Sequence, residues 1–135
     1  MRFLLDTCVV SEGIRPKPGA AFVDWVRYQE PASLYISVLT LGELYFGVAQ
    51  LNNPEKERQL NSWIAVVEKQ FANRIVVLDD FAARHWGYLR AAYPKAQTAD
   101  AQLAATAMAH DFTFATRNVK HFRFDGLKLV NPWEA

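Results

Sequence analysis

Three acidic side chains stand where carboxylates could act together. Asp6 directly follows the apolar run FLL, Glu43 lies within ISVLTLGELYFGV, and Asp100 lies near the start of TADAQLAATAMAH. Carboxylate oxygens without a nearby cluster of Cys and His favour Mg²⁺ or Mn²⁺ over zinc. Such an ion can activate a water and neutralise the charge that builds on a phosphoryl group, which is how metal-dependent nucleases cut phosphodiesters.

Asp6 and Glu43 also have structural alternatives. An Asp after a strand can cap a helix or form a turn, and for Asp6 alone this is about as plausible as a functional role. Thr40 and Glu43 fit the capping-box pattern, which on its own favours a role at the start of a helix. However, Ser37 is an equally good cap one turn earlier. A Gly at position 47, on the same helical row as Glu43, would leave space beside the carboxylate.

Asp100 has an alternative of the same kind, because Thr98 is a plausible N-cap and an acid in the first turn is favoured by the helix dipole.

Electrostatics argues for a bound cation if the three acids meet. Two carboxylates about 4 Å apart repel by roughly 4 kcal/mol at an effective dielectric near 20. The net stability of a fold is only about 5 to 15 kcal/mol, so three crowded carboxylates would need a compensating charge.

Short apolar runs alternate with segments of helical periodicity along the chain. This alternation predicts a three-layer α/β/α sandwich with a mainly parallel sheet of about five strands. The predicted strands are residues 3–5, 34–36, 75–78, 112–115 and 127–130, and the predicted helices are 22–28, 38–51, one with an apolar stripe over 60–71, 81–93 and 99–110. Side chains just past the carboxyl ends of parallel strands meet in a common crevice, where such folds bind ligands.

Length and composition predict one globular domain spanning residues 1–135. The net charge of +1 predicts no strong overall attraction to nucleic acid or membranes, so any such binding needs a local patch. The only cysteine, Cys8, excludes an internal disulfide and suits a reducing compartment; we expect it to be a small buried thiol. No secretion signal and no membrane-spanning run are recognisable, so we expect a soluble cytoplasmic protein.

The segments LLDTCVVSE, ISVLTLGELYFGV, ADAQLAATAMAH and ATRNVKHF, with the terminal NPW, occur in this order along nearly the whole chain. Together they resemble the PIN domain family, particularly the VapC and FitB-like toxins of toxin–antitoxin pairs. The resemblance implies an endoribonuclease that depends on a divalent cation, Mg²⁺ or Mn²⁺. It also implies a homodimer, held inactive by a cognate antitoxin, with RNA as the substrate; transfer RNA is expected from the resemblance alone.

The resemblance also implies roles for individual residues. Asp6, Glu43 and Asp100 match the acidic metal-site residues of the family, which are its catalytic residues. Thr7 and Thr116 match the small hydroxyl residues that line the same pocket.

Two positions depart from the family pattern. Asn118 stands where many relatives carry a further acid that helps to hold metal. Its amide oxygen can accept a hydrogen bond from a water, but it carries no charge, which argues against a firmly held second metal. Cys8 stands where relatives commonly have Asn, and a thiol is a poor substitute for an amide and an unsuitable ligand for a hard ion.

A local basic patch follows the fourth predicted strand. The stretch TRNVKHFRF contains Arg117, Lys120 and Arg123, which could bind RNA phosphates, although a solvated basic loop explains them equally well. His121, in the same stretch, is of a residue type that can act as a general acid or base. Nothing in the sequence places it near the acids, so we expect it to have a surface role.

Two other functions remain open at this point. A receiver-like phosphoacceptor module also uses acids at the ends of parallel strands, and there Asp79 would be the acceptor, although this residue also suits a helix cap. That function requires an acidic pair after the first strand and a Lys after the last, whereas Thr7 follows Asp6 and Asn131 follows LKLV. The second is a catalytically weak PIN domain that binds an antitoxin, because Asn118 replaces an acid.

Overall fold

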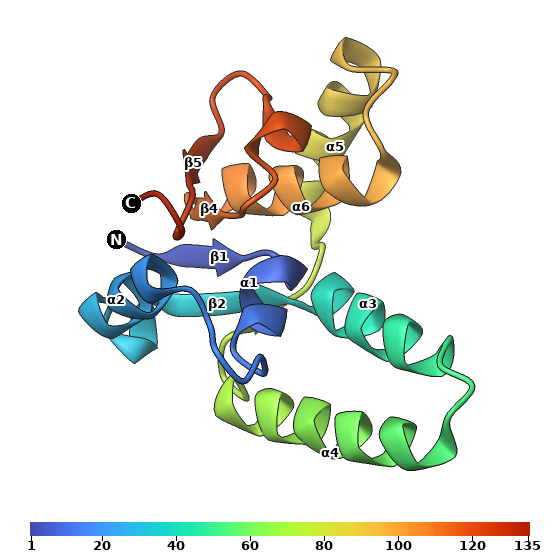
Figure 1. The fold of residues 1–135 in the computed structure, drawn as a ribbon. Helices are drawn as coiled ribbons and strands as arrows, with labels where there is room; N and C mark the ends of the chain where they lie inside the picture. Colours follow the sequence, from blue (N-terminus) through green and yellow to red (C-terminus); the bar gives the residue numbers. More distant parts are fainter.

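The computed structural model describes all residues, 1–135, and contains a five-stranded sheet (Figure 1). Every neighbouring pair of strands is parallel, and their order across the sheet is β3-β2-β1-β4-β5. The carboxyl ends of all strands therefore point to one edge of the sheet. In chain order the strands are β1 (Phe3–Leu5), β2 (Leu34–Ser37), β3 (Ile75–Val76), β4 (Thr113–Ala115) and β5 (Lys128–Val130).

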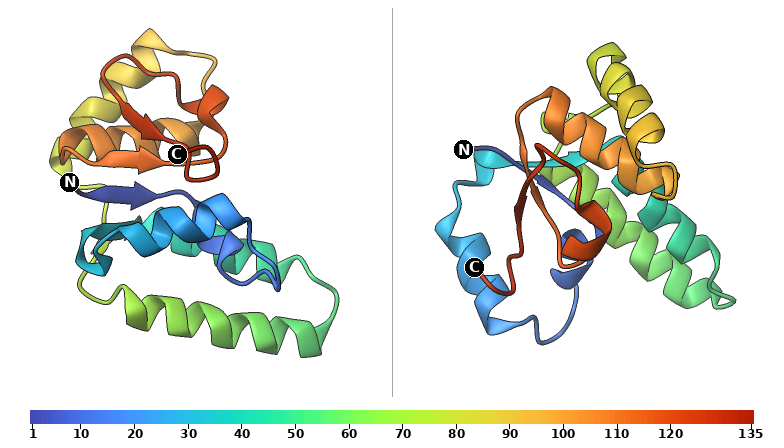
Figure 2. Two further views of the ribbon diagram at one scale, coloured as in Figure 1. Left: turned by 60° about the vertical axis from the view of Figure 1, so that its left-hand side comes forward. Right: turned by 90° about the horizontal axis from the view of Figure 1, so that it is seen from above.

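Helices cover both faces of the sheet, as predicted for a three-layer α/β/α sandwich. Figure 2 shows α5 and α6 on one side of the strands and α2, α3 and α4 on the other. None of these helices combines the length and apolar character needed to span a membrane. The helices are α1 (Thr7–Glu12), α2 (Ala20–Tyr28), α3 (Val38–Ala49), α4 (Pro54–Gln70), α5 (Asp80–Ala92) and α6 (Thr98–Ala109), with short 3-10 helices η1 (Pro31–Ser33) and η2 (Val119–Phe122).

The central strand β1 is buried on both faces, which explains its unbroken apolar sequence. Phe3 and Leu5 pack into the core formed with α1 to α4, whereas Leu4 packs into the core formed with α6. Leu4 lies opposite Phe114 of β4 in the parallel register, and both side chains are fully buried. Because successive side chains of a strand alternate between faces, three consecutive apolar residues supply both cores.

The predicted strands are all present, but one ends two residues earlier than expected. The strand expected at residues 75–78 is limited to Ile75–Val76, and the next residue, Val77, is exposed. β3 is an edge strand, and the chain leaves it to cross to α5 on the opposite face of the sheet. The helix α1, directly after β1, was not predicted.

A buried carboxylate fastens the C-terminal segment to the N-terminal loop. Glu12, at the end of α1, accepts hydrogen bonds from the backbone N–H of Gly19 at 3.0 Å and from Nε1 of Trp133 at 3.3 Å. The Gly19 N–H is the main cause of the lowered pKa of Glu12, to which the indole and Arg15 add. Trp133 also stacks on Phe22 of α2. The terminal NPW segment is therefore held against the helices of this face.

Truncation of a buried side chain in α4 should destabilise the fold much more than truncation of an exposed one. Ile64 is 0% exposed and Val66 is 53% exposed on the same helix. Ile64→Ala should lower the free energy of unfolding by about 2 to 5 kcal/mol, because it removes buried atoms and leaves a cavity. Val66→Ala should change it by less than about 0.5 kcal/mol. Urea unfolding measures both, and equal losses would contradict the packing described for α4.

Candidate active site

A cavity of about 320 Å³ lies at the carboxyl edge of the sheet, beside the ends of β1 and β4. At this point the strand order reverses, because the chain runs from β1 to β2 on one side and later returns to β4 on the other. Open α/β sheets bind ligands at such switch points. We call this cavity the acidic pocket; it is lined by Asp6, Thr7, Cys8, Ser11, Glu43, Asp100, Leu103, Asn118, His121 and Phe122.

Asp6 is both a helix cap and part of the pocket. The residue ends β1, is 7% exposed, and is the N-cap of α1. Its Oδ1 accepts a hydrogen bond from the backbone N–H of Thr7 at 2.8 Å, and its Oδ2 accepts one from the hydroxyl of Thr116 at 2.7 Å. The thiol of Cys8 lies 3.6 Å from the same Oδ2. These neutral donors fix the orientation of the carboxylate without neutralising its charge.

Glu43 reaches the pocket from α3 and does not cap the helix. The side chain of Ser37 caps α3 by accepting from the N–H of Leu39 at 3.0 Å, so the capping box expected at Thr40 and Glu43 is absent. Thr40 is instead fully buried, with no hydrogen-bond partner for its hydroxyl. Oε2 of Glu43 accepts from the hydroxyl of Thr7 at 3.2 Å. This contact joins α3 to the start of α1 across the pocket.

Asp100 enters the pocket from the first turn of α6, where the sequence placed it. The predicted cap, Thr98, is instead the first helical residue, and Gln97 is the N-cap without a side-chain hydrogen bond to the helix. Oδ2 of Asp100 lies 3.7 Å from Nδ1 of His121, and the Asp100 side chain is 18% exposed.

The electrostatics of the pocket is dominated by carboxylates. Partial burial is the main cause of the raised pKa of Glu43, to which the nearby charges of Asp6 and Asp100 add. Burial likewise raises the pKa of Asp100, against the opposing influence of His121. No lysine or arginine nitrogen lies within 4.0 Å of any of the three carboxylates. The pocket therefore carries an excess of negative charge that favours a bound cation.

The donor set suits a hard, hydrated cation better than a fully dehydrated one. No three His, Cys, Asp or Glu side chains are placed so that all could hold one ion. Mg²⁺ usually keeps several waters and binds through one or two carboxylates, so it does not require three side chains to meet on one ion. The pocket offers oxygen donors from three carboxylates, the Asn118 amide and the Thr7 hydroxyl. These residues fit Mg²⁺ or Mn²⁺ held partly through water.

Of the hydroxyl and amide residues named from the sequence, two line the acidic pocket and one lies behind it. Thr7 and Asn118 line the acidic pocket. Thr116 does not line it, but lies fully buried behind Asp6. Its hydroxyl donates to Asp6 and accepts from the backbone N–H of Asn118 at 3.0 Å. Thr116 thus connects the end of β4 to the carboxylate at the end of β1.

The basic patch expected after β4 is only partly assembled. Lys120 and Arg123 line a second cavity next to the acidic pocket. Arg117 lines neither cavity; the carbon of its guanidinium lies 4.9 Å from the centre of the Trp133 ring. The cation–π contact with Trp133 holds Arg117 outside both cavities, which the linear sequence could not indicate.

His121 and Cys8 are pocket residues that the sequence did not identify as such. His121 is more than half exposed, but it also lines the acidic pocket, so the expected surface role was incomplete. The helix η2 turns the side chain of His121 back towards Asp100 of α6. In the sequence, only the position of His121 three residues after Asn118 pointed to this. Cys8 is partly rather than fully buried and also lines the pocket.

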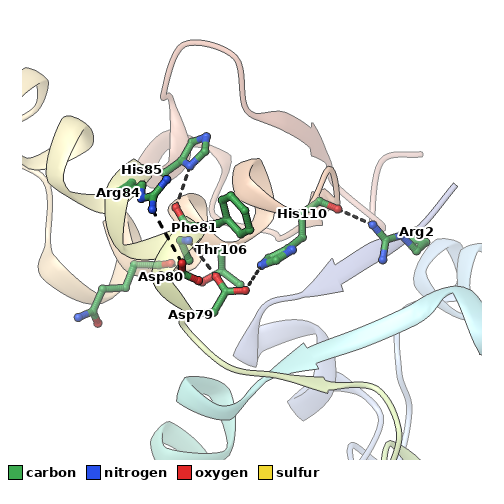
Figure 3. A network of polar contacts seen from close by, with 10 residues as sticks. Arg2, Asp79, Asp80, Phe81, Arg84, His85, Thr106 and His110 are labelled. Carbon is green, nitrogen blue, oxygen red and sulfur yellow. Dashed lines mark hydrogen bonds and ion pairs between the residues drawn. The ribbon is translucent and has the colours of Figure 1, made fainter.

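Asp79 stands apart from the acidic pocket, in a different polar network (Figure 3). It caps α5, as expected, by accepting from the N–H of Ala82 at 2.9 Å. Its Oδ2 lies 2.7 Å from Nε2 of His110, whose carbonyl accepts from the guanidinium of Arg2. The backbone N–H of Ala82 is the main cause of the lowered pKa of Asp79, ahead of His110. These bonds give Asp79 a structural role, so a phosphoacceptor function is not favoured.

Comparison with known proteins finds similarity along nearly the whole chain. The family model described as PIN domain matches residues 3–127. VapC ribonuclease Y4jK of Sinorhizobium fredii is 36% identical, with 97% of each chain covered. Toxin FitB of Neisseria gonorrhoeae is 35% identical, covering 96% of this chain and 97% of that protein. The crystal structure of FitAcB from Neisseria gonorrhoeae superposes with a TM-score of 0.90 at 33% identity, covering 98% of this chain and 99% of that chain.

The raised pKa of Glu43 predicts that removing its charge stabilises the fold, by an amount that depends on pH. The folded chain disfavours the ionised form of Glu43, so ionisation of this side chain lowers the stability of the fold. This loss of stability is full above the folded pKa and vanishes below the unfolded pKa of about 4.3. In the metal-free chain, Glu43→Gln should raise the thermal midpoint at neutral pH, and this gain should shrink as the pH falls towards about 4.

Melting curves recorded in EDTA across this pH range make the comparison. Glu134→Gln is the matched control, because Glu134 is exposed near the C-terminus. It should show no comparable change between the two ends of the range. A gain for Glu43→Gln that is the same at all pH values would show that ionisation of Glu43 is not its cause.

Proposed function

This chain is a member of the PIN domain family, and we propose that it is a metal-dependent endoribonuclease and the toxin of a toxin–antitoxin pair. The observation that carries the proposal is the acidic pocket, where Asp6, Glu43 and Asp100 from three distant parts of the chain line one cavity at the switch point of the sheet. The relatives named as a ribonuclease and a toxin support the same function.

Asp6, Glu43 and Asp100, with Asn118, are the residues that would hold Mg²⁺ or Mn²⁺. When bound, such a cation neutralises charge on the phosphoryl oxygens and makes a water more acidic. The protein contributes the placement of its carboxylates. Asp6 is the most constrained, because the Thr7 N–H and the Thr116 hydroxyl fix its two oxygens, whereas Glu43 is held by one hydroxyl.

Asn118 supplies an amide in place of a fourth carboxylate at the rim of the pocket. Its side-chain oxygen can accept a hydrogen bond from a water, but it adds no negative charge. The pocket is therefore expected to hold one cation firmly rather than two. This arrangement limits how much charge the site can neutralise during hydrolysis.

A cognate antitoxin and a second copy of this chain are the proposed protein partners. Solved toxin–antitoxin complexes share this fold. Large apolar side chains on α3 and α5 remain exposed, at 64% for Phe46, 55% for Phe81 and 78% for Tyr88. Exposed aromatic residues of this kind suit a surface that a partner covers. A cytoplasmic location fits an RNA substrate and a chain with a single cysteine.

Loss of the Asp6 charge should abolish RNA cleavage. Purified Asp6→Asn, incubated with labelled RNA and Mg²⁺ or Mn²⁺, should cleave at least about 10²-fold more slowly, because the pocket loses its most constrained charged ligand. Asp100→Asn should also slow RNA cleavage. EDTA should stop cleavage by the unmodified chain, and added Mg²⁺ or Mn²⁺ should restore it.

Asp24→Asn is the matched control, because Asp24 is an exposed acid on α2, outside the pocket. It should cleave at the normal rate. Cleavage that survives both EDTA and Asp6→Asn would show that the metal-dependent mechanism is wrong. A chain that binds its antitoxin but cuts no RNA with either metal would instead be a catalytically weak binding partner.

A further inference from the structure

A second and larger cavity, of about 700 Å³, adjoins the acidic pocket. Asp100 and His121 line both cavities and so form a shared wall between them. The larger cavity lies between the connection from α5 to α6 and the segment that includes η2, which packs against α6 (Figure 1). We call it the basic groove; apart from the shared wall, its polar and aromatic lining consists of Tyr93, Lys95, Gln97, Lys120, Arg123 and Phe124.

The basic groove has an excess of positive charge that no protein group balances. Lys95, Lys120 and Arg123 are all exposed, and none forms a salt bridge with an acidic side chain. Asp100 is the only acid in the lining, and it belongs to the shared wall. Three cations from two separate segments of the chain thus converge on one cavity without an anionic partner.

The start of α6 adds to this positive potential. The N-cap Gln97 lines the groove, and its side chain makes no hydrogen bond to the helix. The N–H groups of the first turn are therefore free of a side-chain acceptor, and the positive end of the helix dipole lies at the groove. Helix N-termini can bind phosphates and other anions; here Asp100 in the first turn offsets part of the dipole, and the helix end adds to the charge of three cations.

We propose that the basic groove binds the phosphodiester backbone of RNA on one side of the bond that is cut in the acidic pocket. This inference rests on the proposed function, because the shared wall of Asp100 and His121 places the groove next to the site of hydrolysis. The groove attracts the strand that the acidic pocket itself repels. It thereby gives the protein a means of holding a polyanion beside three carboxylates.

The groove contacts the backbone rather than the bases. Its two aromatic residues, Tyr93 and Phe124, pack edge-to-face against each other, with ring centres 5.0 Å apart, and the Tyr93 hydroxyl accepts from the N–H of Asp125. Phe124 is buried and cannot stack on a base, and Tyr93 is half-buried, with its ring held by Phe124 and its hydroxyl by the backbone of Asp125. Contacts to phosphate carry no sequence information, so the groove should contribute equally to RNAs of different sequence.

The test is RNA binding by the metal-free chain, which removes cleavage from the measurement. The probes are fluorescently labelled oligouridylate and oligoadenylate of about ten nucleotides, followed by anisotropy in EDTA. The groove variant is Lys95→Gln/Lys120→Gln/Arg123→Gln. The matched control, Lys56→Gln/Arg58→Gln/Lys69→Gln, removes three exposed cations from α4.

At about 50 mM salt the groove variant should bind both probes at least about tenfold more weakly than the control. The slope of log affinity against log salt should fall by about 2, as expected for three lost contacts to single-stranded phosphates. All six positions are exposed, and matching thermal midpoints would show that both variants fold. Equal affinities and slopes for the two variants would overturn the proposal, as would undetectable RNA binding by the unmodified chain.

Cleavage assays separate this proposal from the proposed function. If the unmodified chain cuts RNA but the groove variant binds and cuts like the control, the groove proposal is wrong and the nuclease stands. If no protein cuts RNA but the groove variant alone loses RNA binding, the groove is an RNA-binding site, but the nuclease is wrong and so is the placement of the groove beside a bond that is cut. Normal RNA binding combined with lost affinity for the antitoxin would assign the groove to a protein partner and overturn the proposal.

Discussion

The carboxylate of Asp6 lies buried at the end of the central strand, beside two further acids and without a lysine or arginine within 4.0 Å. Most features of the site follow from this constraint. Thr116 and the Thr7 N–H orient the charge but cannot neutralise it, and the pKa values of Glu43 and Asp100 are raised because their ionised forms are disfavoured in the same place. A group that removes this repulsion must come from outside the chain, and a hard divalent cation has the charge and the oxygen preference to do so.

The fold concentrates opposite charges on the two sides of one short wall. Because α6 runs back towards the start of β4, its N-terminus lies at the carboxyl edge of the sheet, so Asp100 enters the acidic pocket while Gln97 lines the basic groove. A protein with a net charge of only +1 can in this way present both a cation site and an anion site. Net charge describes the long-range field, whereas the local distribution decides what binds next to the acids.

Sequence was sufficient for the sheet and for the acids, and insufficient for the residues around them. Buried parallel strands have unbroken apolar sequences, and parallel strands end at one edge, so Asp6, Glu43 and Asp100 could be expected to meet. Local patterns were insufficient where several residues competed for one role: the sequence offered both Ser37 and Thr40 as caps of α3, of which Ser37 serves, and Gln97 rather than Thr98 precedes α6. His121, Lys95 and Glu12 were missed because their positions depend on how loops pack on distant helices, which no local periodicity encodes.

Anomalous diffraction from crystals grown with MnCl₂ tests the central claim most directly, because it locates the cation without relying on catalysis. A cation site built by these carboxylates should give a manganese peak inside the acidic pocket, bound to Asp6 and to at least one of Glu43 and Asp100, directly or through water. An ordered pocket that stays free of manganese at saturating concentration, or a peak bound only elsewhere on the protein, would contradict it.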